Sequence, residues 1–456
     1  MLLGGAIAAL TIVFNLLLPH RMRLIGVALL VVPQIWIPGL PEAELATIAV
    51  VWTLSTCVAG ITARDRTHAN SSLVVIGAVF VAATAVSLTW ALPGGINNGM
   101  SAVVRGVVFL LWLREMIVVA KDDPKLLNTI MIWLIPGVSA QALLAILFRV
   151  SPDIEERFLR SNLAAVFVGP QAEGLYGAMR NNVLYPFKSG GLYVNGNVAS
   201  LFGAVAALLL ILAARRSANR WLYVFAALSA AGAIFTGSKT ALVLAPVCVL
   251  AIIFLPHALK AWVALVGLWI TLLVPVAISV GIELLQQNAP AFYSAAVQSV
   301  AGRDPLWRGA AQLFTESPLL GVGFGGWSEQ MQRFTHQPEL PPHNLIVAAW
   351  AYSGIVAALV AIVFLVAAMN FAVRVAAAQP TTRDRRNAVL ALCAIAWVFL
   401  HGMADNTTIY GEQRTMILVA LAFGYLYAMR PDPQISADAV GTDADRARRS
   451  PAAISS

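Results

Sequence analysis

Apolar stretches of membrane-crossing length recur along almost the whole 456-residue chain, and they constrain its fold more than any other feature. An α-helix needs about 20 apolar residues to cross the hydrocarbon core of a bilayer. Because that core holds no water, each crossing must satisfy its own backbone hydrogen bonds, which favours helices. Only 11% of the residues are charged, whereas soluble domains carry about 25%. We therefore predict an all-α, polytopic transmembrane helical bundle.

The apolar runs and the breaks between them predict about 12 to 13 membrane crossings. The first run either spans the bilayer fully or forms a truncated, re-entrant piece. Because no basic region precedes it, we expect no cleavable signal peptide. The crossings are expected near residues 2–19, 24–40, 45–62, 72–90, 101–119, 126–148, 190–213, 221–237, 239–256, 261–283, 343–372, 388–404 and 414–429.

These crossings form one predicted transmembrane catalytic domain, residues 1–429. Two long loops interrupt it, at about 149–189 and 284–342. Residues 430–456 are polar and poor in aromatic side chains, so this tail is expected to be disordered.

The distribution of Lys and Arg over the short loops predicts the orientation of the chain. The short loops at 41–44, 91–100, 237–239 and 405–413 contain among them only Lys239. Parity then places both long loops outside and the C-terminus in the cytoplasm of a multi-pass protein of the plasma (inner) membrane. The net charge of +8 is thus explained by topology, and no nucleic-acid partner is predicted. The loops of the predicted cytoplasmic side carry Arg21, Arg23, Arg64, Arg66, Lys121, Lys125, Arg215, Arg216, Arg220, Lys260, Arg374, Arg383, Arg385 and Arg386.

Polar and glycine residues that are unusual in so apolar a chain gather in residues 301–354. The first part of this segment predicts a short amphipathic helix with Asp304 as the N-cap and Pro305 as the first helical residue. Arg303 lies just before this helix and Arg308 lies within it. The two arginines either solvate an interfacial helix beside lipid phosphates or bind an anionic substrate.

A glycine-rich stretch follows that helix, with Gly321, Gly323, Gly325 and Gly326 close together. A G-x-G pattern predicts a nucleotide loop only between a strand and a helix, and no strand is expected here. The pattern instead predicts a tight turn in which two backbones approach closely.

Three histidines are expected on the outer side: His336, His343 and His401. Their spacing matches no ligand motif, so we predict no metal, although three histidines leave zinc as an alternative. A single histidine suits the role of proton acceptor, because its unperturbed pKa of about 6.5 lies near neutral pH. His343 is the predicted base, since it lies beside Asn344 where the loop re-enters the membrane. His401 is expected to be a buried hydrogen-bonding residue.

Further polar residues are expected near the same face. Charges within a membrane are costly and mark candidate functional sites, although Arg105 could instead snorkel or pair with helix carbonyls. Asp405 is expected to orient the base or a sugar hydroxyl. The candidate substrate-binding residues are Arg308, Lys239, Arg105, Asn195, Asn197, Asn344, Asp405 and Arg414, beside the catalytic candidates His343 and Arg303.

Several cations and a histidine, with few acids, indicate an anionic substrate at the outer leaflet. A polyprenyl-diphosphate-linked glycan fits, because Arg grips diphosphate with two parallel hydrogen bonds. Diphosphate is a good leaving group, so the reaction needs positive charge and one base, and neither a metal nor another cofactor is predicted. A single displacement of this kind inverts the anomeric configuration.

Several short motifs carry a resemblance to a known family. The runs G-R-D-P-L-W and P-L-L-G-V-G-F-G-G, then His343-Asn344 with Gly354 downstream, resemble the signature of the O-antigen ligase and O-antigen polymerase superfamily of bacterial membrane glycosyltransferases. The earlier segments G-L-Y-V-N-G-N and T-G-S-K-T-A-L-V resemble the preceding motifs of the same family, so the likeness covers roughly residues 190–360.

The resemblance implies a transferase that takes glycan from an undecaprenyl-diphosphate carrier outside the plasma membrane, without metal or nucleotide sugar. By that likeness His343 matches the base and Arg303 a diphosphate-binding arginine. Lys239 stands where the family usually has arginine, and a lysine keeps the charge but loses the two-pronged fork.

The sequence leaves several functions open. A ligase and a polymerase share this chemistry and differ in the glycan or lipid acceptor, which leaves no short motif. A protein O-oligosaccharyltransferase is a third option. A secondary transporter or flippase of an anionic or polyprenyl-linked substrate is the alternative from another class, but such proteins tend to have inverted repeats and helices broken at mid-membrane, which are not apparent here.

Overall fold

The computed structural model describes residues 2–38, 46–63, 71–175, 183–185, 187–258, 303–405 and 407–430. Over these residues the chain is α-helical, with only isolated β-bridges outside the helices. The prediction of an all-α helical bundle is therefore confirmed. The predicted crossing at 261–283, the loop residues 284–302 and the tail from residue 431 onward lie outside the described residues.

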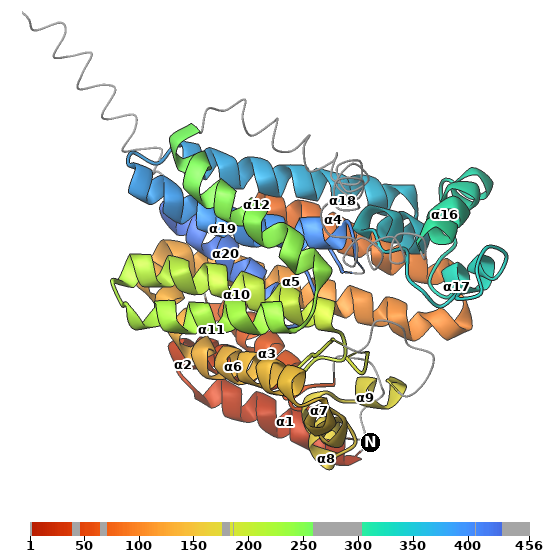
Figure 1. Ribbon diagram of the computed structural model, residues 1–456, viewed down its shortest axis with the longest axis horizontal. Helices are drawn as coiled ribbons and strands as arrows, with labels where there is room; N and C mark the ends of the chain where they lie inside the picture. Colours follow the sequence, from red (N-terminus) through yellow and green to blue (C-terminus); the bar gives the residue numbers. More distant parts are fainter. Residues whose placement is uncertain are drawn as a thin grey trace, which may run out of the picture.

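Long helices lie side by side and run back and forth along one direction (Figure 1). Five helical segments of the described chain, at 72–90, 124–150, 196–217, 239–257 and 345–377, are long and apolar enough to cross a membrane. The long helices are α1 (Leu2–Leu17), α2 (His20–Leu30), α3 (Ile48–Ala63), α4 (Ser72–Ser87), α5 (Ile96–Asp122), α6 (Pro124–Val150), α10 (Gly196–Ser217), α11 (Trp221–Phe235), α12 (Lys239–Ala258), α18 (Leu345–Ala377), α19 (Thr382–Gly402) and α20 (Thr415–Met429).

Short helices gather at one end of the bundle, on the right of Figure 1, which we call the α16 end. The turns that join α10 to α11 and α18 to α19 lie at the opposite end, as does the end of α20. Both predicted long loops thus contribute to the same end, as the parity of the crossings requires. The short helices there are α7 (Pro152–Leu159), α8 (Asn162–Phe167), α9 (Gln171–Gly174), α16 (Asp304–Glu316) and α17 (Gly326–Met331).

Two helices, α10 and α20, form the centre of the bundle and are buried along most of their length. Both are apolar on all sides, the pattern of a helix surrounded by other helices. By contrast, α1, α11, α12 and α18 expose large apolar side chains such as Leu2, Trp221, Phe254 and Val356. Soluble monomers rarely expose so much apolar surface, so this outer face is suited to lipid.

The predicted crossing at 24–40 is wrong in its second half. Helix α2 ends at Leu30, and Gln34 and Ile35 adopt positive φ angles of 62° and 53°. Pro33 explains the break, because proline disfavours helix at the preceding residue and supplies no backbone N–H. The crossing predicted from residue 190 also starts late, since α10 begins at Gly196.

A bend in α18 joins the glycine-rich stretch to the bundle. At Gly354, φ is 82° and ψ is 177°, a combination that is essentially restricted to glycine. The bend frees the carbonyl of Ala351, which accepts hydrogen bonds from the N–H groups of Val322 (2.9 Å) and Gly323 (3.0 Å). The predicted close approach of two backbones at this glycine-rich turn is therefore confirmed.

Replacing Gly354 by alanine is expected to destabilise this junction. A Cβ atom there would lie 2.5 Å from the carbonyl oxygen of Leu319, and the strained backbone alone costs about 1–3 kcal/mol. Thermal unfolding in detergent should show a lower midpoint for Gly354→Ala. Gly94→Ala is the control, because no atom lies within 4 Å of a Cβ added there. Equal midpoints for the two variants would contradict the role given to this bend.

Candidate active site at the α16 end

Arg303 occupies the N-cap position of α16, and Asp304 is the first helical residue. The prediction of Asp304 as the N-cap is therefore wrong by one residue. The Asp304 carboxylate instead pairs with Arg308 one turn along, which suits an acid in the first turn of a helix. The predicted amphipathic character is confirmed, because Leu306 and Leu313 are buried on one face.

His343 lies at the start of α18, immediately before its cap. The side-chain oxygen of Asn344 accepts hydrogen bonds from the N–H groups of Ile346 (2.9 Å) and Val347 (3.1 Å). His343 has a φ of 53°, which is uncommon for a residue other than glycine. Such conformations persist only where the surrounding structure holds them, and they cluster at active sites. Asn344 thus acts as a cap that places His343.

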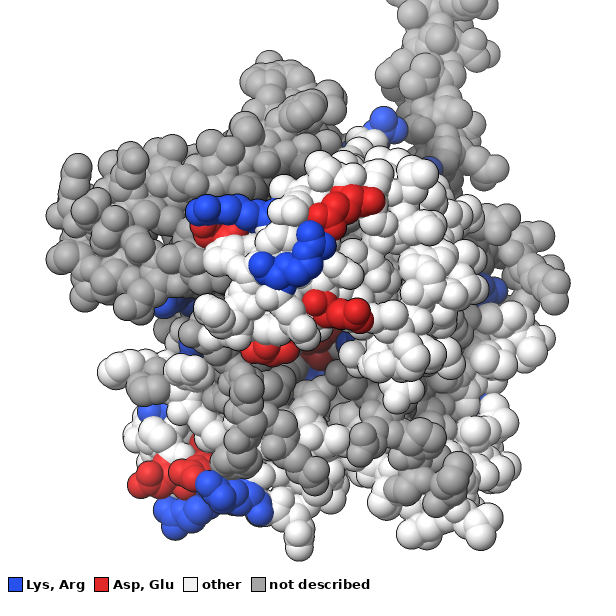
Figure 2. All heavy atoms as spheres, turned by 90° about the vertical axis from the view of Figure 1, so that its right-hand side faces the viewer, with Lys and Arg blue, Asp and Glu red and all other residues white. Residues whose placement is uncertain are grey.

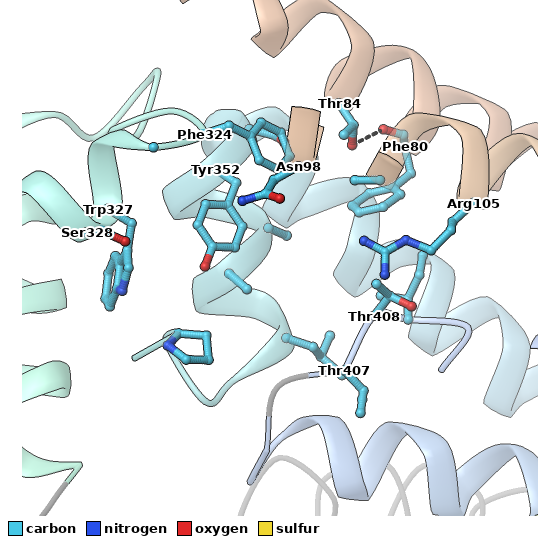
Figure 3. A pocket seen from close by; sticks show the side chains of 18 of the residues that line it. Phe80, Thr84, Asn98, Arg105, Phe324, Trp327, Ser328, Tyr352, Thr407 and Thr408 are labelled. Carbon is cyan, nitrogen blue, oxygen red and sulfur yellow. Dashed lines mark hydrogen bonds between the residues drawn. The ribbon is translucent and has the colours of Figure 1, made fainter. Parts of the chain in front are cut away.

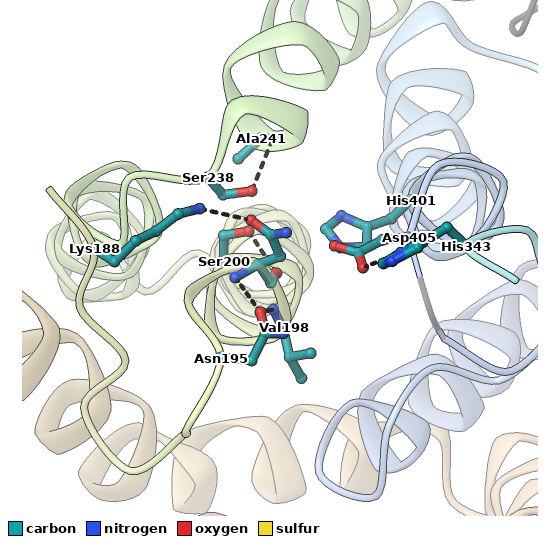
Figure 4. A network of polar contacts seen from close by, with 10 residues as sticks. Lys188, Asn195, Val198, Ser200, Ser238, Ala241, His343, His401 and Asp405 are labelled. Atoms are coloured by element: carbon teal, nitrogen blue, oxygen red, sulfur yellow. Dashed lines mark hydrogen bonds and ion pairs between the residues drawn. The ribbon is translucent and has the colours of Figure 1, made fainter. Parts of the chain in front are cut away.

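Asp405 lies between two imidazoles. Its carboxylate is 3.5 Å from Nδ1 of His343 and 3.6 Å from Nε2 of His401 (Figure 4). All three residues are buried, with exposed fractions of 4%, 8% and 0%. Burial alone would raise the pKa of Asp405, but the two histidines hold it well below its usual range. The sequence predicted His343 and Asp405 as candidates, and the structure brings them together.

Two of the segments singled out in the sequence fold against each other. Residues 187–195 run as a strap over the turn between α11 and α12, where Ser189 donates hydrogen bonds to the carbonyls of Ala145 (2.8 Å) and Phe235 (3.1 Å). Asn195 caps α10 by accepting from the N–H groups of Asn197 and Val198. The side-chain oxygen of Asn195 therefore satisfies the backbone at the start of α10.

Buried side chains hold this strap from the other side. Gln141 donates to the Gly190 carbonyl and accepts from the N–H of Leu192, both at 2.8 Å. Glu155 accepts from the N–H of Gly190 at 2.9 Å, and its burial raises its pKa to about 7. The strap is thus fixed by polar contacts that the sequence did not predict.

The strap presents Lys188, which was not among the predicted residues. Its Nζ donates a hydrogen bond of 3.1 Å to the side-chain oxygen of Asn197. Burial lowers the pKa of Lys188 to about 8, and the charge of Lys239 adds to this effect while that of Asp405 opposes it. Its position beside the G-L-Y-V-N-G-N segment was the signal available in the sequence.

Cations from three separate segments lie near one another, and two of them lie near the Asp405 carboxylate. Arg303 and Lys188 lie close enough to interact electrostatically with Asp405, and Lys239 lies close enough to interact with both of these cations. In Figure 4, Lys188 lies on one side of the polar side chains at the start of α10, and the histidines with Asp405 lie on the other side. The arrangement suits a multiply charged anion between the cations and the His343–Asp405 pair.

An apolar groove of about 490 Å³ leads away from Arg303 between α16 and α18. Trp307 and Phe314 line it from one side, and Trp350 and Leu359 from the other. The lining continues past the bend in α18, so the groove extends on the order of 20 Å along this helix. Among the described residues that line the groove, Arg303 contributes the only charged side chain.

A second and larger cavity, which we call the chamber, lies between α4, α5, α17 and residues 407–412, and has a volume of about 870 Å³ (Figure 3). Arg105 lines it, with its guanidinium pointing between Phe80 and Thr408. The predicted candidate Arg105 thus belongs to this chamber and not to the groove.

Two predicted substrate-binding arginines have other surroundings. The side chain of Arg308 is 78% exposed and paired with Asp304 on the outer surface, where charged side chains of both signs lie (Figure 2). Arg414 is buried, donates to the carbonyls of Leu192 (3.0 Å) and Phe167 (3.1 Å), and stacks on the ring of Tyr193. The structure does not bring either arginine to His343.

No group of three or more His, Cys, Asp or Glu side chains in the described part of the chain is arranged to hold a metal ion.

Comparison with known proteins identifies one part of the chain. Residues 224–362 match the model of a family described as O-antigen ligase. This segment runs from α11 into α18 and contains Lys239, Arg303 and His343. No curated protein matches the chain. The family match confirms, over residues 224–362, the predicted resemblance to the O-antigen ligase and O-antigen polymerase superfamily.

Proposed function

We propose that the protein transfers a glycan from an undecaprenyl-diphosphate carrier to an acceptor hydroxyl at the outer face of the plasma membrane. One observation carries the proposal. Three cations, the His343–Asp405 pair and an apolar groove meet at the α16 end of the bundle. The cations can bind a diphosphate, and the groove can hold its polyprenyl chain. The base can take the proton of the attacking hydroxyl.

The enzyme binds the two chemically different parts of the donor, its diphosphate and its polyprenyl chain, at different places. The diphosphate lies among Arg303, Lys188 and Lys239, and Arg303 supplies two parallel hydrogen bonds to it. The polyprenyl chain follows the groove from Arg303 along α18. Each buried CH₂ group contributes about 0.8 kcal/mol, so a long isoprenoid chain binds mainly through this groove.

The reaction is a single displacement. The acceptor oxygen forms a bond to the anomeric carbon of the glycan, and the bond from that carbon to the diphosphate oxygen breaks. The electron pair leaves with undecaprenyl diphosphate, whose growing negative charge the three cations stabilise. Nδ1 of His343 faces Asp405, so Nε2 takes the proton of the acceptor hydroxyl. The configuration at the anomeric carbon inverts, and the step needs no metal.

The distribution of basic residues supports the orientation. Lys121, Arg215, Arg220 and Arg383 lie near the helix ends opposite to the α16 end. Under the positive-inside rule these ends face the cytoplasm, so the site and both long loops are extracytoplasmic. Lipid-linked glycan and its acceptor would then meet the enzyme on the outer side.

A direct assay tests this function. The purified protein in detergent is given undecaprenyl-diphosphate-linked glycan and membrane glycolipid from cells that make both, with EDTA and without nucleotide sugar. We expect mass spectrometry to show glycan on the acceptor and free undecaprenyl diphosphate. If the detergent assay gives no transfer product and the protein reconstituted into vesicles moves the intact lipid-linked glycan across the bilayer, the protein is a flippase and the proposal is overturned.

The protonation of Lys188 predicts an alkaline limit for donor binding. Because the lowered pKa is about 8, Lys188 is charged below pH 8 and loses its charge as the pH rises through that value. A hydrogen bond to a charged group contributes about 1.5–3 kcal/mol, so kcat/KM for the donor should fall by roughly 10- to 100-fold. Lys188→Arg should remove this fall, since its guanidinium stays charged. A wild-type profile that is flat above neutral pH would show that Lys188 does not bind the diphosphate.

A further inference from the structure

The chamber has the chemistry of a saccharide site. Phe324 and Tyr352 are stacked, with ring centroids 5.2 Å apart and planes 13° apart, and both line the chamber. Trp327 borders the chamber behind them, with a ring that is almost fully buried (Figure 3). Aromatic faces pack against the apolar C–H face of a sugar ring, while polar groups placed around them fix its orientation.

The polar groups of the chamber are suited to hydroxyls. Glu329 and Glu339 lie at its exposed rim, and a carboxylate accepts hydrogen bonds from sugar O–H groups. Asn98 and Arg105 line it farther along α5, and both can donate to sugar oxygens. The chamber therefore offers acceptors and donors around an aromatic surface.

His343 and Asp405 lie in the wall between the chamber and the groove. Next to His343, Pro341 and Leu345 line the chamber, whereas Asn344 and Ile346 line the groove. The second segment of the wall shows the same division. There, Thr407 and Thr408 line the chamber, whereas Met403 and Ala404 line the groove.

We infer that the chamber binds the acceptor, and that it takes an unphosphorylated, hydroxyl-rich end of a saccharide. This inference rests on the proposed function. The acceptor hydroxyl approaches from the chamber, gives its proton to His343 and bonds to the anomeric carbon. The carbon–oxygen bond to the diphosphate breaks toward the groove. The chamber and the groove thus place the nucleophile and the leaving group on opposite sides of the reacting carbon, as a single displacement requires.

The charges of the lining residues indicate which substrate binds in the chamber and which binds in the groove. Among the described residues of the chamber, the carboxylates of Glu329, Glu339 and Glu412 outnumber the one cation, Arg105, and they would repel a phosphorylated group. The groove is lined by Arg303 and by no carboxylate among its described residues. The diphosphate therefore belongs at the groove, and the chamber favours a saccharide without phosphate.

Two bulky substitutions on opposite sides of the wall test this assignment. Ala348 lines only the chamber and Ala311 lines only the groove. With membrane glycolipid as acceptor, Ala348→Trp should raise the acceptor KM at least about tenfold and change the donor KM by less than about threefold, where a tenfold change corresponds to about 1.4 kcal/mol. Ala311→Trp should show the reverse pattern. Inorganic pyrophosphate should compete with the donor and not with the acceptor.

The outcomes separate the two proposals. If the wild-type enzyme transfers no glycan, the proposed function fails. If it transfers glycan but Ala348→Trp raises the donor KM, or leaves the acceptor KM unchanged, only the chamber assignment is overturned. Competition between pyrophosphate and the acceptor would overturn the preference for an unphosphorylated end. Should Ala348→Trp not fold, Asn98→Ala replaces it, because Asn98 is exposed and lines the chamber, and it must raise the acceptor KM selectively.

Discussion

Replacing His343 by asparagine is expected to lower the turnover number by about 10²- to 10⁴-fold, the contribution typical of a general base. Asparagine cannot accept a proton at neutral pH, so the attacking hydroxyl would lose its proton to water. The cations that hold the diphosphate come from other segments and stay in place. We therefore expect the donor KM to change little while kcat falls.

The choice of asparagine follows from the backbone. His343 has a φ of 53°, in the left-handed region, and Asn tolerates that region better than most other residues. Alanine would add strain next to the cap of α18 and would mix a folding effect with a catalytic one. Turnover of His343→Asn is measured from initial rates with both substrates saturating, and its thermal midpoint is compared with that of the wild type.

His336→Asn is the matched control, since His336 lies in the same loop and its side chain is exposed. We expect this variant to keep wild-type turnover. If His343→Asn retained full turnover with both substrates saturating, His343 would not be the base. His401 would then be the next candidate, because it also contacts Asp405.

The fold was largely predictable because one physical rule governs the chain. Membrane-length apolar runs can satisfy their backbones only as helices, so all the predicted crossings within the described residues contain a helix. The deviations arise where local backbone chemistry acts inside an apolar run. Pro33 ends one helix early, and Gly354 bends another at the point where the glycine-rich turn docks.

The site was less predictable, because a polar residue beside an apolar run has two common uses. Asn195 and Asn344 were predicted to bind substrate, yet both cap helices. Arg414 satisfies buried carbonyls in the same way. A cap and a ligand contact both need a short polar group at a helix end, so sequence position alone cannot separate them. The contact between His343 and Asp405 depends on the packing of α18 against α19, which periodicity does not reveal.

Replacing Arg303 by alanine is expected to lower kcat/KM for the donor by about 10²- to 10³-fold, the effect typical of removing one group that stabilises developing negative charge. Arg303 lies in the lining of the groove and close to Asp405, and no other charged side chain among the described residues of that lining can take its place between lipid chain and diphosphate. Arg303→Lys keeps the positive charge but loses the two parallel hydrogen bonds of the guanidinium, so this variant should keep only part of the wild-type activity. The rates are measured at low donor concentration with saturating acceptor.

Arg308→Ala is the control on the same helix. Its side chain is exposed and paired with Asp304, and exposed ion pairs contribute little, so kcat/KM should stay within about fivefold of the wild type. An interfacial role for Arg303, in contact with lipid phosphates alone, makes a different prediction. In that case Arg303→Lys would be as active as the wild type, and Arg303→Ala and Arg308→Ala would lose similar, small amounts of activity. Because both arginines lie near the start of α16 and carry the same charge, the comparison separates the effect of position relative to the groove from the effect of charge.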